Sequence, residues 1–387
     1  MTSLRVDRIV TEPDLMALET DWRALETTCG NTLPFRTFTW ASCWWKHLRE
    51  QRRAVRDSLA FMTVRQSEGR LVGVAPLLLT ERPAVGPLRT RSLRFIGADP
   101  NMTEVRGVLC EPGFEAVCYA ALAEAIGDPG HPFDWLEWTG VEPHHGARGA
   151  LSALQLLWTP DVVCCVLDLP ATWEEVRAAG GRNLKESLRK CYNSLKRDGL
   201  DFALEVVAQG AEVPSALEDF FRLHRARADS QETPPHKDVF ADAACRAFLL
   251  DVCEQFAKQG ALRIFRLQVG GGLVATRVGF VLGGCLYLYY SGYEPAFAKY
   301  GVMTTALAEA IKYAVEHGLR QVNLSTGRDS SKLRWRPRQV VFEEALMFSR
   351  PPFGRAKHAA LEMIERAMQQ RAVRRYAERF KLLRRTV

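Results

Sequence analysis

The sequence has no apolar stretch that is long enough to cross a membrane as a helix. Its longest uncharged apolar run, Val278–Tyr293, contains four glycines and falls short of the roughly 20 residues that a spanning helix needs. The β-type composition of this run fits a buried pair of strands better. The first residues, Met1–Arg8, contain no apolar core of a secretory signal. We therefore expect a cytoplasmic protein.

Several motifs of metal and catalytic sites are also missing. The ten cysteines show no C-x-x-C spacing, and we interpret them, including the adjacent Cys164 and Cys165, as buried thiols. His131, His144 and His145 do not stand at metal-ligand spacing from any cysteine or carboxylate cluster, so we predict no metal. The absence of a Walker-type loop and of a G-x-S-x-G elbow argues against a P-loop nucleotidase and against a hydrolase of that type.

The positive charge is concentrated at the C-terminal end. The formal net charge is +7, whereas residues 350–387 alone contain eleven Lys or Arg and three Glu, a net charge of +8. The rest of the chain is close to neutral, which argues against a DNA-binding protein. Apolar residues of this segment follow helical spacing at Leu361, Ile364, Met368, Ala372, Tyr376, Phe380 and Leu383. The predicted basic helix over 350–387 either contacts an anionic membrane or acidic partner or packs on the body of the protein.

The order of predicted elements occurs twice along the 387 residues, which are enough for two domains. Each half reads as two helices, a β-hairpin, a further strand, a helix and a strand. Paired anchors keep a nearly constant offset: Pro13 with Pro214, Phe38 with Phe240, and Gly69–Val72 with Gly271–Val274. We predict a duplicated protein with a first module over 1–165 and a second module over 166–349.

One segment of the second half predicts an anion site. An aromatic strand over Leu286–Ser291 is followed by Gly301, a helix to about His317, and a strand over Gln321–Leu324. A glycine at the start of a helix leaves backbone N–H groups unpaired, and these groups and the helix dipole attract phosphate. The corresponding loop of the first half, Ala98–Glu104, has no such glycine, so we expect the first module to be degenerate.

The motifs together are similar to a known family. Over Leu15–Phe348 the chain resembles the CelD/BcsL group of the GNAT acyltransferase superfamily. The resemblance is carried by Phe38-Thr39-Trp40, Leu93–Gly97, the basic helix Arg182–Arg197, Phe221–Arg227, Tyr290–Pro295, Tyr300-Gly301 and Gly327–Trp335. It implies a mixed α/β fold of two tandem GNAT-like modules, each a mostly antiparallel sheet flanked by helices. The sequence departs from the wider GNAT pattern at Ala298, where Gln or Arg is usual, and at Met303, where a small residue is usual.

The same resemblance implies a function and its alternatives. An acyl-CoA such as acetyl-CoA would be the co-substrate, and the acyl group would pass to an amine or a sugar hydroxyl of a small-molecule or saccharide acceptor. Members of the group are associated with cellulose and exopolysaccharide production. One alternative is an aminoacyl-tRNA-dependent enzyme like the FemABX proteins, for which the basic helix Arg182–Arg197 is the internal tRNA-binding candidate. The other is an inactive binding protein of polysaccharide machinery.

Candidate site residues follow from the position of each residue in the family motifs and from its chemistry. His224 is the candidate general base, because Arg225 and Arg227 would keep it neutral. Tyr290 is a candidate acid toward the leaving thiolate, and Lys332 lies in a cationic loop. The donor would contact Tyr289, Ser291, Lys299, Tyr300, Gly301, Val302, Met303 and Thr304. The acceptor would contact Arg189, Arg227, Arg328, Asp329 and Arg334.

Overall fold

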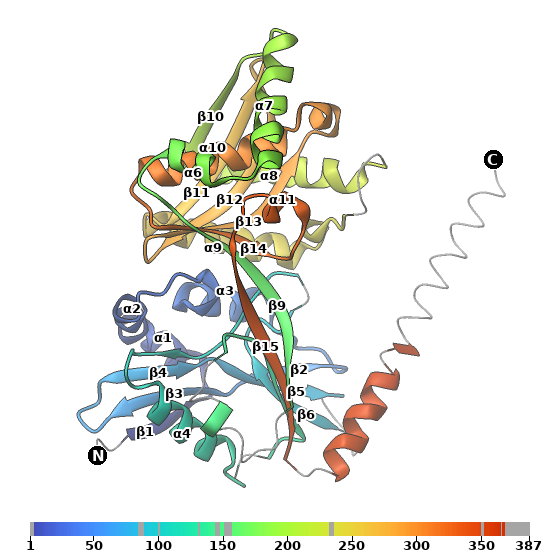
Figure 1. The fold of residues 1–387 in the computed structure, drawn as a ribbon. Coiled ribbons are helices and arrows are strands. Elements are labelled where there is room, and N and C mark those ends of the chain that lie inside the picture. The colour runs from blue at the N-terminus through green and yellow to red at the C-terminus, as the bar shows by residue number, and fades with distance from the viewer. Residues whose placement is uncertain are drawn as a thin grey trace, which may run out of the picture.

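A computed structural model describes residues 4–83, 89–99, 101–130, 132–143, 148–150, 157–231, 236–349, 352–364 and 366–367. Two α/β modules lie one above the other, and a single large sheet passes through both (Figure 1). Among the described residues this sheet has eleven strands in the order β10-β11-β12-β13-β14-β9-β15-β8-β6-β5-β2. The predicted mixed α/β fold with two tandem modules is therefore confirmed.

The first module combines part of this sheet with a smaller sheet of order β1-β3-β4-β7. Its elements are β1 (Leu4–Ile9), α1 (Glu12–Ala17), α2 (Glu19–Thr28), η1 (Pro34–Arg36), α3 (Phe38–Leu48), β2 (Arg56–Leu59), β3 (Phe61–Gln66), β4 (Leu71–Ala75), β5 (Leu77–Arg82), β6 (Thr90–Phe95), β7 (Leu109–Cys110), α4 (Glu115–Ile126) and β8 (Trp135–Val141). The second strand of the β-hairpin predicted in the first half, over Leu71–Leu79, is not continuous: it divides at Pro76 into β4 and β5, which belong to different sheets. Proline has no N–H for a continuous ladder.

The second module agrees closely with its predicted elements. They are β9 (Leu157–Asp168), α6 (Trp173–Ala179), α7 (Arg182–Arg197), β10 (Phe202–Val207), α8 (Glu212–Asp229), η3 (Val239–Ala241), α9 (Ala243–Lys258), β11 (Leu262–Val269), β12 (Gly272–Leu282), β13 (Cys285–Tyr293), η4 (Pro295–Tyr300), α10 (Val302–Glu316), β14 (Gln321–Thr326), α11 (Ser330–Leu333) and β15 (Arg338–Phe348). Helix α6 begins with a capping box formed by Thr172 and Glu175.

Two long strands join the modules. Strand β9 pairs with β14 of the second module, and β15 pairs with both β9 and β8 of the first (Figure 1). The predicted boundary between residues 165 and 166 falls inside β9. A shared hydrophobic core adds to this connection, since α3 of the first module contacts α9 of the second and Trp40 packs edge-on against Phe248.

The duplication is visible in the parallel strand pairs. In the first module β6 pairs in parallel with β8 across helix α4, and in the second β13 pairs in parallel with β14 across α10. Parallel neighbours need such a crossover connection. Equivalent strand–helix–strand units therefore lie on opposite sides of β9 and β15 in the sheet order.

The C-terminal segment starts as a helix over residues 352–364 and lies beside the first module (Figure 1). Lys357 Nζ donates to Asp134 at 2.6 Å, and the His358 ring contacts those of Trp135 and Phe348. Met363 and Ile364 are exposed. Most of the predicted stretch Ala356–Leu383 lies outside the described residues. No helix within the described ranges is both long and apolar enough to span a bilayer.

Helix α8 lies against β13 with almost no space between the two backbones. A Cβ atom on Gly292 would stand 2.4 Å from the His224 nitrogen and 2.6 Å from the Leu223 carbonyl carbon. This glycine therefore allows the close approach that places α8 behind the site strand.

We predict that Gly292→Ala lowers the free energy of unfolding by roughly 1–3 kcal/mol, the usual cost of overpacking a core. Urea unfolding followed by circular dichroism would measure this change. Gly272→Ala is the control, because its Cβ would meet its nearest neighbour at an ordinary 3.7 Å. Equal stability of the two variants would contradict the packing argument.

Candidate functional site

The central parallel strands part at the candidate site. Strands β13 and β14 pair only from Cys285 to Tyr287 and from Gln321 to Asn323. Beyond this point the β14 backbone turns at Ser325, whose φ is 70°, and the Asn323 side chain accepts the Ser325 N–H at 2.9 Å. Beyond these residues the backbone groups of β13 and β14 do not pair with each other, so they can hydrogen-bond a ligand.

A cavity of about 420 Å³ lies at this opening. It is lined by Arg227, Arg277, Tyr289, Ser291, Tyr293, Ala298, Gly301, Val302, Met303, Thr304, Leu307, Leu324, Ser325, Asp329, Ser331, Lys332 and Trp335. Most of the predicted donor residues are in this wall: Tyr289, Ser291 and the helix start from Gly301 to Thr304. We call it the donor cavity.

The start of α10 has the geometry that anion binding requires. Gly301 has φ +67°, and its carbonyl accepts the N–H groups of Thr304 and Thr305 at 2.8 and 3.1 Å. Among the described residues no acceptor contacts the N–H groups of Val302 and Met303. A Cβ on Gly301 would stand 2.5 Å from Cys191 Sγ of α7. Glycine is thus required here by both backbone conformation and packing.

Two arginines place positive charge in the donor cavity. Arg277 projects from β12, and its Nε is buried without a hydrogen-bond partner among the described residues. Burial, and after it the charge of the neighbouring Arg227, lower the pKa of Arg277 to about 10, whereas Asp329 opposes this. A buried cation without a close counter-ion favours an anionic ligand. The sequence analysis missed Arg277, although a lone charge within the apolar run of β12 is a usable signal.

Lys332 lies in the wall of the donor cavity. Its Nζ donates to the Thr326 carbonyl and lies 3.3 Å from the Asp329 carboxylate. Asp329 in turn caps the short helix α11 by accepting the Ser331 N–H at 3.1 Å. Lys332 therefore holds the loop after β14 in place and adds positive charge beside the cavity.

His224 and Tyr290 are not in the cavity wall. His224 of α8 is fully buried, its Nδ1 lies 3.2 Å from the Ser291 carbonyl, and its ring packs on those of Phe240 and Tyr290. Burial, more than the charge of Arg227, lowers the pKa of His224. The Tyr290 hydroxyl donates to the Asn101 carbonyl of the first module. A catalytic role for either residue stays a prediction that this placement does not favour.

The remaining predicted residues divide between cavity and surface. Arg227 and Asp329 line the donor cavity. Lys299 is exposed with its Nζ 4.9 Å from the Tyr300 ring, and Tyr300 donates its hydroxyl to Asp198 at 2.9 Å. Arg328 is exposed, and Arg334 donates to Ser187 Oγ at 2.8 Å.

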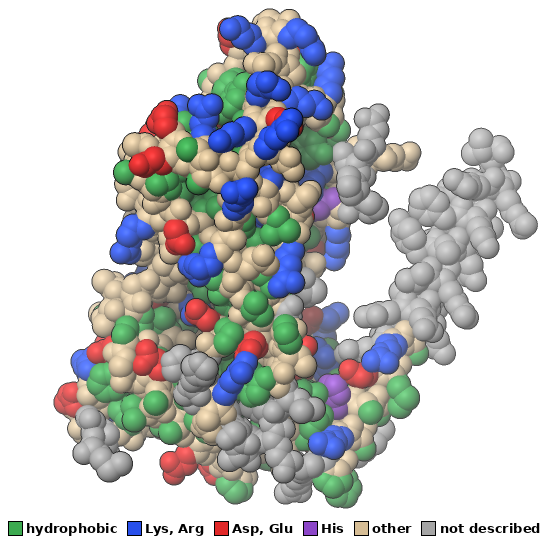
Figure 2. Space-filling model, in the orientation of Figure 1, with side chains coloured by type: hydrophobic (Ala, Val, Ile, Leu, Met, Phe, Trp, Pro, Cys, Tyr) green, Lys and Arg blue, Asp and Glu red, His purple; other side chains and the backbone are tan. Residues whose placement is uncertain are grey.

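Arg189 lies in a shallow hollow on α7 with Arg182, Lys185 and Glu186. Lys and Arg side chains gather around α7 at the top of the molecule (Figure 2). This surface is separate from the residues that line the donor cavity.

The loop after β6 of the first module contacts strand β13 of the second. Three tyrosine hydroxyls of β13 donate to the loop after β6: Tyr287 to the Glu104 carboxylate, Tyr289 to the Met102 carbonyl and Tyr290 to the Asn101 carbonyl. Glu104 also accepts the Ser325 hydroxyl at 2.7 Å. Burial raises the pKa of Glu104, while the bonds from Tyr287 and Ser325 and the charge of Lys332 oppose the rise. The sequence analysis missed Glu104 as a site residue.

Within the described ranges no group of three or more His, Cys, Asp and Glu side chains could hold a metal ion. His131, His144 and His145 lie outside those ranges. The described cysteines are all free thiols, and most of them are buried.

The part of the chain that forms the donor cavity is similar in sequence to a known domain family. Residues 182–333, which include all the residues that line the donor cavity except Trp335, match the acetyltransferase (GNAT) domain family. This match lies within the second module. No match was found among curated proteins.

Solved structures with the same fold are distant in sequence. A crystal structure of FemX superposes with a TM-score of 0.60 at 11% identity and covers 87% of this chain and 98% of that one. L-PGS from Bacillus licheniformis has a TM-score of 0.51 at 13% identity, with 93% and 99% covered. The C-terminal domain of a putative lysylphosphatidylglycerol synthetase from Agrobacterium fabrum has a TM-score of 0.51 at 12% identity, with 90% and 96% covered. At these identities the likeness concerns the fold alone.

We predict that the protein loses stability as pH falls from about 6.5 to about 4. The rings of His224 and His236 lie 4.7 Å apart, and burial lowers the pKa of His236 to about 4, with Arg227 and His224 adding to the effect. In this window the unfolded chain binds protons that the folded chain does not, so the free energy of unfolding decreases with decreasing pH.

Urea unfolding across this pH range should give a flatter dependence for His236→Gln than for the wild type. A variant of the exposed His317, His317→Gln, is the control. An unchanged slope in His236→Gln would contradict the assignment.

Proposed function

We propose that the protein transfers an acyl group from acyl-CoA, bound in the donor cavity, to an amine or hydroxyl acceptor. The observation that carries this proposal is the parting of β13 and β14 beside a helix start with two unpaired N–H groups. The match of residues 182–333 to the acetyltransferase domain family supports it independently.

Each part of the donor has a counterpart in the donor cavity. The N–H groups of Val302 and Met303 suit a pyrophosphate, and Arg227 and Arg277 add positive charge. The open backbone edges of β13 and β14 can hydrogen-bond the amide groups of the pantetheine arm, as an added strand would. Holding the thioester there supplies the proximity that acyl transfer requires.

The proposal extends to the acceptor and the biological role. The resemblance to the CelD/BcsL group favours a saccharide or amine acceptor in exopolysaccharide or cellulose production. An aminoacyl-tRNA donor is the alternative, and the basic face of α7 would be its binding surface. A binding protein without catalysis is the second alternative.

We predict that CoA and acetyl-CoA raise the melting temperature of the wild type saturably, and that Met303→Glu weakens this binding roughly tenfold or more, which corresponds to about 1.4 kcal/mol. A carboxylate at the start of α10 would repel the pyrophosphate, whereas it favours the helix itself. The fold should therefore survive the change, which is not expected of Gly301 variants because of Cys191.

Met303→Gln is the matched control, since it has the same length without the charge and should bind CoA nearly as the wild type does. Thermal-shift titration gives both affinities. No stabilisation of the wild type by CoA or acetyl-CoA would contradict an acyl-CoA donor. Stabilisation by aminoacyl-tRNA instead would favour the first alternative.

A further inference from the structure

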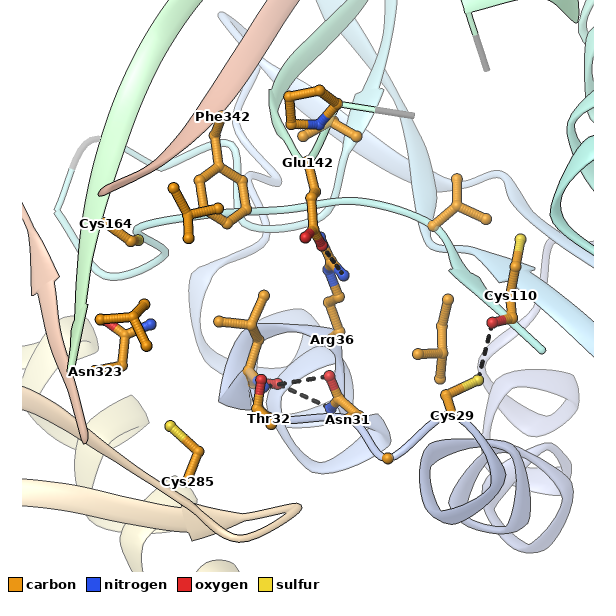
Figure 3. A pocket seen from close by; sticks show the side chains of 18 of the residues that line it. Cys29, Asn31, Thr32, Arg36, Cys110, Glu142, Cys164, Cys285, Asn323 and Phe342 are labelled. Carbon is orange, nitrogen blue, oxygen red and sulfur yellow. Dashed lines mark hydrogen bonds and ion pairs between the residues drawn. The ribbon is translucent and has the colours of Figure 1, made fainter. Parts of the chain in front are cut away.

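A second cavity, of about 410 Å³, lies between the two modules (Figure 3). Among the described residues its walls carry two arginines and two glutamates, namely Arg36, Arg338, Glu115 and Glu142. Arg36 pairs with Glu142 at 3.2 Å, and Arg338 lies 3.5 Å from the Asp168 carboxylate. The charges around this cavity are thus balanced within the protein. The excess positive charge of the chain lies elsewhere, in residues 350–387.

The first part of that basic segment is a helix that is fixed to the first module by one face. We call residues 352–364 and 366–367 the C-terminal helix. Lys357 Nζ donates to the Asp134 carboxylate at 2.6 Å, and the His358 ring lies 5.2 Å from that of Trp135. A Cβ atom on Gly354 would stand 2.7 Å from the Asp134 carbonyl oxygen, so the two backbones are in close contact. The orientation of the helix on the protein is therefore defined.

A second face of the C-terminal helix is apolar and exposed. Its residues follow the spacing of three and four that places side chains on one side of a helix: Phe353, Ala356, Ala360, Met363, Ile364 and Ala367. Phe353 is 74% exposed, Met363 65% and Ile364 57%, and the first two are the most exposed large apolar side chains in the described ranges. Single exposed apolar residues are normal, whereas a continuous row of them indicates a binding surface.

Positive charge accompanies this apolar row. The twenty residues that follow the C-terminal helix, 368–387, contain seven Lys or Arg and one Glu. Within the helix Arg355 and Arg366 are exposed, and their separation of three turns places them on one side. Figure 2 shows hydrophobic side chains and Lys or Arg together on this helix, beside the first module. Apolar side chains flanked by cations are typical of a helix that lies in the interface of an anionic membrane.

We propose that the C-terminal helix docks the protein on the surface of a membrane that contains anionic lipids. Phe353, Met363 and Ile364 enter the boundary between headgroups and acyl chains, and the cations of residues 350–387 contact lipid phosphates. An anionic bilayer satisfies the apolar row and the charge at once. A second copy of the chain would bring the same charge of +8 in its own segment and would be repelled. This inference does not depend on the acyl-CoA function.

Flotation with lipid vesicles tests the proposal. The full-length protein should float with vesicles of equal parts phosphatidylcholine and phosphatidylglycerol, and it should not float with vesicles of phosphatidylcholine alone. Added salt should weaken the binding, because it screens the charges. Failure to float with the anionic vesicles, or equal flotation with both kinds, would overturn the proposal.

The triple variant Phe353→Gln, Met363→Gln, Ile364→Gln tests the apolar row. Its affinity for the anionic vesicles should fall roughly tenfold or more, since removal of each apolar side chain from water contributes to binding. Its melting temperature should stay at the wild-type value, because the three side chains are exposed and glutamine favours a helix. An unchanged affinity would contradict docking through this row.

The matched control is the triple variant Val10→Gln, Met16→Gln, Val117→Gln. It removes three exposed apolar side chains of the first module that lie outside the C-terminal helix. Its affinity for the anionic vesicles should equal that of the wild type. A loss as large as that of the first triple variant would show that general surface hydrophobicity, and not the apolar row, determines the binding.

The charge and the competing occupant have tests of their own. Arg374→Gln with Arg375→Gln removes two cations that follow the helix, and it should weaken the binding to anionic vesicles roughly tenfold or more. Sedimentation equilibrium without lipid measures self-association, and the wild type should be no more associated than the variant of the apolar row. A wild-type dimer that dissociates in this variant would assign the row to a second copy of the chain and overturn membrane docking.

Discussion

The site depends on the contact between β13 and the loop after β6. Buried hydroxyl groups are costly unless they are hydrogen-bonded. Three acceptors on one loop, at Asn101, Met102 and Glu104, satisfy Tyr290, Tyr289 and Tyr287. This loop therefore cannot move away from the second module without leaving three donors unpaired. Tyr289 lines the donor cavity and donates to the Met102 carbonyl, so the first module holds one strand of that cavity in place.

This contact changes the meaning of the degenerate first module. The sequence predicts that its loop Ala98–Glu104 cannot bind a phosphate, because no glycine leads into a helix there. In the structure the same loop instead inserts against the second module and places Glu104 beside Ser325. One copy of a duplicated unit thus provides the donor cavity, and the other holds a strand of that cavity in place.

Local patterns predicted the fold better than the site. Helix α7 has the bounds Arg182–Arg197 that the sequence predicted for the basic helix, because such a pattern depends on neighbours in the chain. Glu104 could not be predicted in the same way. Its partner Tyr287 is 183 residues away, and only the crossing of β9 and β15 between the modules brings the two together.

The cationic side of the donor cavity explains how the departures from the wider GNAT pattern can be compatible with an anionic ligand. Ala298 supplies no charge, and Lys299, its neighbour, is exposed beside the Tyr300 ring instead of lining the cavity. The positive charge comes from Arg277 of β12 and Arg227 of α8. Burying Arg277 without a close counter-ion costs stability, as its lowered pKa indicates. Proteins tolerate such a loss of stability most readily at a functional site. A bound anion would offset the loss, because it would pair with the Arg277 charge.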